Sequence, residues 1–212
     1  MTDLRLLSVN LGQPRPRGKS RTGILKAPVD QPVLLTEGGL DGDFIGNAKH
    51  HGGPDQAVYL YSAEDYAWWE GQIGRHLPHG TFGENLTVSS FGPRPLRVGD
   101  RITVGPVVLQ LTAHRTPCAT LADHMGDPGF VKKFAEANRG GAYARVLQTG
   151  TLQPGESLGI EPAPDSAPTI DDLFALWHTR KKDPDFMRLA LEAPLAERAR
   201  KALKEWLAKA EA

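Results

Sequence analysis

The chain has 212 residues, with 25 basic and 25 acidic side chains, and 40% of its residues are hydrophobic. This composition is typical of a soluble globular protein and excludes a disordered or collagen-like chain. No apolar run reaches the ~18 residues that a transmembrane helix needs, so we expect no membrane partner. The first residues lack the features of a secretory signal, so we expect a cytoplasmic protein.

The balance of charge argues against nucleic acid as a partner, because nucleic-acid-binding proteins usually carry a basic excess. The only local excess lies in residues 1–30, where six basic side chains oppose two acidic ones. A solvated loop and an anion site for a small phosphate-bearing ligand both remain open there. The basic residues are Arg5, Arg15, Arg17, Lys19, Arg21 and Lys26.

Cys118 is the single cysteine. It excludes an intrachain disulfide, a cysteine-rich zinc site and a protein-held iron–sulfur cluster, which needs several thiolates. A lone cysteine is often only a small buried hydrophobe. Here His114 and Arg115 stand just before it, and nearby cations lower the pKa of a thiol, which favours the reactive thiolate. A zinc deaminase would need a second cysteine at position 121, which is leucine.

Up to residue 160 the sequence favours short strands joined by turns, since glycine and proline are frequent and helical periodicity is rare. Ser62 is expected to cap a helix over residues 63–73, with Asp65 completing the capping pair. A second helix is expected over 130–138, ended by Gly140 and Gly141. Strands are expected at 4–10, 32–36, 57–61, within 81–88, at 102–104, 107–112, 143–149 and 156–160.

A proline-rich linker over residues 161–168 separates this region from a helical one. Thr169 caps the first of three expected helices, and Pro184 and Pro194 open the other two. We therefore predict a β-rich domain over residues 1–163 and a small three-helix domain over 168–212. Residues 165–212 carry nine basic and nine acidic residues, and we expect the helical part to be dispensable for ligand binding and to dock a partner.

Two further segments could line a site. Residues 49–55 read Lys-His-His-Gly-Gly-Pro-Asp, which gives a ligand close access to the backbone beside imidazole groups. A polar turn with incidental histidines is the less favoured alternative. A zinc site is weakly supported there, because no HExxH motif follows. Residues 83–85, Gly-Glu-Asn, could offer an amide and a carboxylate, but a simple turn is favoured.

Taken in order, the segments GLDGD, KHHGGPDQAVYLY, FGENLTV, VGDRITVG and RTPC resemble the MOSC domain family, named after the C-terminal domain of molybdenum cofactor sulfurase. A Gly-Gly pair before Tyr143 and a Pro-Gly-Glu turn at 154–156 continue the likeness, which covers residues 30–160. The helical tail is similar to the extension of the YiiM-type members. The resemblance implies a mainly β fold, a β-barrel-like MOSC domain with a few helices, plus the small three-helix domain.

The resemblance also implies a molybdenum cofactor, molybdopterin-bound molybdenum. The family's metal-ligating and catalytic cysteine falls on Cys118, and its cofactor-binding residues fall on Lys19, His51, Gly52, Gly53, Asn85, Arg115 and Thr116. From the residues themselves, a soft thiolate suits a soft metal. Cationic or imidazole side chains suit the cofactor's phosphate and pterin.

The implied activity is reduction of N-hydroxylated compounds to amines: hydroxylamines, N-hydroxylated purine bases or amidoximes. A sulfur carrier that holds a persulfide on Cys118 is the alternative, and a non-enzymatic binding module is a further one. No iron–sulfur cluster can form and no dinucleotide-binding motif occurs, so electrons are expected from a separate reductase protein. The sequence leaves a homodimer open.

Overall fold

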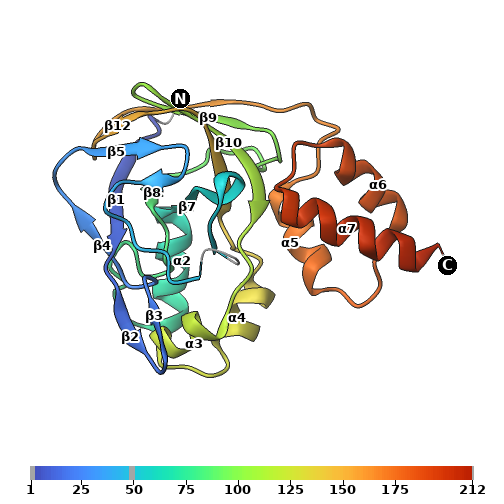
Figure 1. Ribbon diagram of the computed structural model, residues 1–212, viewed down its shortest axis with the longest axis horizontal. Coiled ribbons are helices and arrows are strands. Elements are labelled where there is room, and N and C mark those ends of the chain that lie inside the picture. The colour runs from blue at the N-terminus through green and yellow to red at the C-terminus, as the bar shows by residue number, and fades with distance from the viewer. Residues whose placement is uncertain (1–2, 48–50, 212) are drawn as a thin grey trace.

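The computed structural model describes residues 3–47 and 51–211, and its centre is a strongly curved eight-stranded sheet (Figure 1). Neighbouring strands follow the order β13-β9-β10-β11-β7-β8-β1-β4. All pairs are antiparallel except β7 with β8. The strands are β1 (Leu6–Gly12), β4 (Lys26–Val29), β7 (Val58–Ser62), β8 (Leu86–Val88), β9 (Arg101–Val104), β10 (Val107–His114), β11 (Ala142–Gln148) and β13 (Leu158–Glu161).

The sheet curls towards a barrel but does not close into one among the described residues. A bridge between Arg5 and Ser157 and a hydrogen bond from the Leu158 amide to the Leu4 carbonyl (2.7 Å) bring the start of the chain against β13. Strands β4 and β13 nevertheless remain the two edges of the sheet. The fold is therefore mainly β with helices, as predicted, in an open form of the barrel-like arrangement.

Five further strands form two small sheets. β5 (Val33–Thr36) pairs with both β6 (Gly39–Leu40) and β12 (Gly150–Leu152). β2 (Arg15–Arg17) and β3 (Ser20–Thr22) form an exposed hairpin. No strand was predicted between those expected at residues 4–10 and 32–36, and this was wrong, because the stretch contains β2, β3 and β4. These strands were not predicted because they are rich in arginine, lysine and proline and lack an alternating apolar pattern.

The helix over residues 63–73 is confirmed as α2 (Ala63–Ile73). The Ser62 side chain accepts a hydrogen bond from the Asp65 amide, as the capping pair predicted. The second predicted helix is α4 (Phe130–Ala137), but Asn138, in the left-handed conformation with φ 50°, ends it in place of the glycine pair. A short helix, α3 (Ala119–Met125), and a 3-10 turn, η1 (Pro54–Gln56), were not predicted.

The tail forms three helices beside the sheet (Figure 1): α5 (Ile170–His178), α6 (Pro184–Glu192) and α7 (Glu197–Ala210). Thr169 and Asp183 cap the first two through their side chains. The third begins three residues later than expected, after Ala196, so Pro194 lies in the turn before it. No helix within residues 3–47 and 51–211 is long and apolar enough to cross a bilayer.

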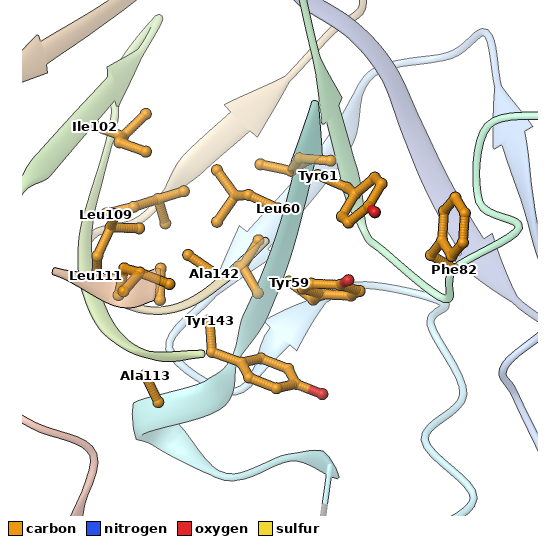
Figure 2. Packing of buried hydrophobic residues seen from close by; sticks show 14 of the residues in the cluster. Tyr59, Leu60, Tyr61, Phe82, Ile102, Leu109, Leu111, Ala113, Ala142 and Tyr143 are labelled. Atoms are coloured by element: carbon orange, nitrogen blue, oxygen red, sulfur yellow. The ribbon is translucent and has the colours of Figure 1, made fainter. Parts of the chain in front are cut away.

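The core lies between the sheet and the helices. Figure 2 shows Tyr59, Leu60 and Tyr61 of β7 beside Phe82, with residues of β10 and β11 across from them. The Tyr61 ring lies 4.7 Å from the Phe82 ring, centroid to centroid. These buried aromatic rings are satisfied at their polar ends, since the hydroxyls of Tyr59 and Tyr61 donate to the carbonyls of Gly140 and Arg139 (2.9 and 2.7 Å).

Candidate active site

A pocket of about 210 Å³ opens beside the β2–β3 hairpin. Its walls come from segments far apart in the sequence, which the sheet brings together. Gly23 and Phe44 meet so closely that a Cβ on Gly23 would lie 1.7 Å from the Phe44 carbonyl oxygen, so only glycine allows this wall to form. The lining includes Arg17, Arg21, Lys26, Asp43, His51, Gln56, Tyr59, Asn85, Arg115, Cys118 and Tyr143.

Cys118 lies where the chain leaves β10 and turns into α3, at the residue that precedes the first turn of that helix. Its thiol is partly buried among apolar neighbours, which by itself would raise the pKa. A hydrogen bond with His51, the charge of Arg115 and the Leu121 amide outweigh burial and lower the pKa of Cys118 to about 6. At neutral pH the side chain is therefore mainly a thiolate.

Arg115 is 3% exposed, and it forms no ion pair with a carboxylate of the described residues. Its guanidinium lies over two aromatic rings, 5.3 Å from the centre of Tyr59 and 5.8 Å from that of Phe134. The Nη1 atom is buried and has no hydrogen-bond partner. A buried cation at a pocket wall with an unused donor is suited to an anionic ligand.

Lys26 and Asp43 form an ion pair on another wall, with side chains 6% and 5% exposed. The Asp43 carboxylate also accepts hydrogen bonds from the Asn85 amide nitrogen (2.9 Å) and from the Gly12 backbone (2.7 Å). Burial lowers the pKa of Lys26, and the contact with Asp43 opposes that shift. Asn85 thus stands in the pocket as the resemblance implied, held by a buried network that sequence reasoning missed.

Sequence reasoning gave neither Lys26 nor Asp43 a role in the site. Lys26 was counted only among the basic residues of the first segment, and Asp43 only inside the GLDGD motif. The pairing of β1 with β4 places Lys26 opposite Gly12, whose amide binds Asp43. No local pattern marks the pair, because no strand was predicted around Lys26 and the contact forms only when β4 pairs with β1.

The structure gathers His51, Asn85, Arg115 and Cys118 around this pocket, as expected. It places four other predicted residues away from the lining. Lys19 is exposed at the tip of the β2–β3 hairpin, while Arg17, Ser20 and Arg21 of the same hairpin line the pocket. Gly52 and Gly53 lead into η1, and Thr116 contacts the ring of His114 (3.3 Å) at a smaller cavity behind the site. His50 lies outside the described residues.

His51 also approaches the hydroxyl of Tyr143, with 3.5 Å between Nδ1 and the oxygen. The imidazole thus lies between a thiolate and a phenol that burial keeps protonated, since burial raises the pKa of Tyr143. The site as a whole offers one thiolate, one unpartnered buried guanidinium, an imidazole and an amide. This set can hold a soft metal at the sulfur and anionic oxygen groups at the nitrogen donors.

A mainly β domain with a thiolate and a buried arginine in one pocket, followed by three helices, defines the class of protein. The profile of the MOSC domain matches residues 47–159. The chain belongs to the MOSC domain family.

Relatives of known sequence share most of the chain. The Bacillus subtilis (strain 168) protein YflK is 34% identical over 91% of this chain and 89% of its own length. YiiM of Escherichia coli (strain K12) is 28% identical over 87% and 84%. A Gibberella moniliformis protein called "Reductase" is 28% identical over 69% of this chain and 27% of its own length.

Among solved structures, YiiM from Geobacillus stearothermophilus superposes with a TM-score of 0.81 at 26% identity, covering 96% of this chain and 99% of that one. The likeness includes the C-terminal helices, because such coverage cannot be reached by the β domain alone. The chain is therefore a YiiM-type MOSC protein, as its sequence predicted.

Proposed function

We propose that this protein is a molybdenum-cofactor-dependent reductase that converts N-hydroxylated compounds to amines in the cytoplasm. The observation that carries the proposal is the pairing, in one pocket, of a low-pKa thiol at Cys118 with the unpartnered buried guanidinium of Arg115. A thiolate is a ligand for a soft metal, and a desolvated arginine binds an anionic group. The name "Reductase" carried by one relative is consistent with this reaction class.

The residues present fit the cofactor. Cys118 would ligate molybdenum through its sulfur, and Arg115 would fill its empty Nη1 donor position with an anionic oxygen or sulfur of the cofactor. Asn85 and His51 line the same pocket and offer further hydrogen bonds. When bound, the cofactor supplies a redox metal centre that can take up the oxygen of an N–O group while two electrons pass to the substrate.

The protein's own contribution is to bind, orient and shield. The Lys26–Asp43 pair fixes the Asn85 amide, so that this wall is rigid before a ligand arrives. The rings of Tyr59 and Phe134 hold the Arg115 guanidinium in place without neutralising its charge. Reduction of a hydroxylamine consumes two protons and two electrons and releases water. The electrons would come from a separate reductase protein.

Metal analysis of protein made in a host that synthesises molybdenum cofactor tests this proposal. We expect about one molybdenum per chain, and reduction of hydroxylamine or benzamidoxime by a chemical reductant. Cys118→Ala should lose both, while Arg180→Ala, a change on the helical tail far along the chain, should keep both. Protein free of molybdenum but carrying cyanide-labile sulfur on Cys118 would instead favour the sulfur carrier.

A further inference from the structure

The His-Gly-Gly-Pro-Asp segment ends at Asp55, a residue that the pocket itself does not use. Asp55 lies in η1, four residues after His51 and next to Gln56, and both of these neighbours line the pocket with Cys118. The carboxylate of Asp55 points away from that pocket, towards the C-terminal helices. Its contacts show what the aspartate does.

Three contacts fix Asp55 between the sheet and the tail. One carboxylate oxygen lies 3.0 Å from Nη2 of Arg145 on β11, and the other accepts the backbone amide of Glu197 (2.8 Å), the first residue of α7. The Asp55 carbonyl accepts the hydroxyl of Thr112 on β10 (2.6 Å). A single residue thus joins two central strands, the N-terminus of α7 and the segment that carries His51.

The partners of Asp55 are themselves tied to the tail. Arg145 donates to the carbonyls of Pro194 (3.2 Å) and Leu195 (3.1 Å), in the turn between α6 and α7. The Thr112 carbonyl accepts the Ala196 amide (3.0 Å). Because each of these bonds ends on residues 194–197, the turn before α7 is held as one unit against β10, β11 and Asp55.

A second contact between tail and site lies on the other side of His51. The His114 ring, next to Arg115 in the chain, lies 5.5 Å from the ring of Phe174 and 4.7 Å from that of Trp177, both on α5. A cavity of only about 50 Å³ remains between the tail and the site. The residues around it include His51, Gln56 and Tyr143, which also line the main pocket, and Trp177, Arg198 and Ala199 of the tail.

We propose that Asp55 is a positioning residue, which uses the docked C-terminal helices as a support to hold His51 against Cys118. The tail is then part of the site's construction, in contrast to the dispensable appendage that the sequence suggested. The inference rests on the proposed reductase function and deepens it, because it names the contacts that keep His51 in the pocket beside Cys118. Asp55 is not among the residues that line the pocket, so it acts on the site through η1.

Two measurements on the cofactor-free protein test this role. Cys118 is the only cysteine, so its alkylation by iodoacetamide at pH 7 has no background. In Asp55→Ala we expect the rate of alkylation to change by about threefold or more, because His51 and Cys118 line the same pocket and a displaced η1 alters the surroundings of the sulfur. Hydrogen exchange of residues 51–57 should become about tenfold faster, while exchange in β1 and α2 stays at the wild-type rate.

Asp165→Ala is the matched control, since Asp165 is an aspartate of the linker with a side chain 95% exposed and a long, 3.7 Å contact to Arg97. It should behave as the wild type in both measurements. Asp55→Asn keeps an oxygen for the Glu197 amide but loses the charge facing Arg145, and should give an intermediate effect. If Asp55→Ala does not fold, the alkylation rate and the hydrogen exchange of Asp55→Asn test the proposal in its place.

Wild-type alkylation and exchange in both Asp55 variants would overturn the inference. A uniform rise in exchange throughout the chain would overturn it too, because Asp55 would then serve general stability only. Neither measurement involves molybdenum, so a failure here is distinct from a failure of the proposed function, which metal content decides.

Discussion

Replacement of Arg115 by methionine should show whether the charge of this residue serves cofactor binding or the stability of the fold. Arg115 is 3% exposed and has an unpartnered Nη1, and such a buried unsatisfied donor costs about 1–3 kcal/mol. The contacts of its guanidinium with the rings of Tyr59 and Phe134 each stabilise the folded state by about 0.5–2 kcal/mol. The cost and the gain are of similar size, so the charge adds little to the stability of the fold.

Methionine keeps the unbranched stem and removes the charge. We expect the free energy of unfolding of Arg115→Met to lie within about 2 kcal/mol of the wild-type value. Urea unfolding followed by tryptophan fluorescence gives this quantity. The same variant, made in a host with molybdenum cofactor, should contain little or no molybdenum.

Arg94→Met is the matched control, because Arg94 does have an acidic partner. Its Nη1 atom lies 2.9 and 3.0 Å from the two oxygens of Asp100, whose side chain is fully buried. Removing Arg94 leaves that carboxylate without its cation and should destabilise the protein by about 3 kcal/mol. If Arg115→Met were destabilised as strongly as Arg94→Met, the charge of Arg115 would serve to stabilise the fold. The unpartnered Nη1 would then be no evidence for an anionic ligand.

Three other expectations concern the same pocket. Cys118→Ser should shift the thermal midpoint by no more than about 3 °C, because the side chain keeps its size, yet it should abolish molybdenum binding; metal retained at wild-type level would place the ligand elsewhere. Lys26→Met should lower the free energy of unfolding by about 2–4 kcal/mol, since the buried Asp43 carboxylate loses its cation. Urea unfolding measures this loss, and a change below about 1 kcal/mol would show that the pair is not stabilising. Asp55→Ala should contain less molybdenum per chain than Asp165→Ala. Equal molybdenum contents would mean that the contacts of Asp55 with the C-terminal helices do not affect cofactor binding.

The sequence predicted a helix or strand correctly where the local residue pattern agreed with the way the element packs in the fold. Both ends of the helix Ala63–Ile73 were predicted correctly. Its start is marked in the sequence because the side chain of Ser62 accepts a hydrogen bond from the amide of Asp65, three residues further along the chain. Helix α3 was missed because it has seven residues and no side-chain cap at Cys118. The exposed β2–β3 hairpin was missed because its strands bury no face and so carry no alternating pattern.

The candidate site divides in the same way. Cys118 and Arg115 could be found from the sequence, because both lie in one short segment whose chemistry is unusual. The Lys26–Asp43 and Asp55–Arg145 pairs could not, since each joins residues 17 or more apart through strand pairing. Lys19 was named only through the family resemblance, whereas its hairpin neighbours Arg17 and Arg21 line the pocket.

The buried histidine beside the site should also make stability depend on pH. Burial, then the charges of His178 and Arg198, lower the pKa of His114 from 6.5 to about 3. The folded protein therefore keeps His114 neutral, while the unfolded chain binds a proton below pH 6.5. Stability from this group is present above pH 6.5 and is lost as the pH falls towards 3. Between pH 6.5 and pH 5 the loss amounts to about 2 kcal/mol.

His114→Phe should remove that dependence, because phenylalanine keeps an aromatic ring against Phe174 and Trp177 but cannot be protonated. The measurement is the free energy of unfolding in urea at pH 7 and pH 5, for the wild type and the variant. Any constant gain or loss in packing cancels in the difference between the two pH values, as do the other titrating groups that both proteins share. The variant should lose about 2 kcal/mol less than the wild type on acidification. If the wild type and the variant lost the same free energy of unfolding, His114 would accept a proton without unfolding. The contact between α5 and the end of β10 would then open to water in the native state.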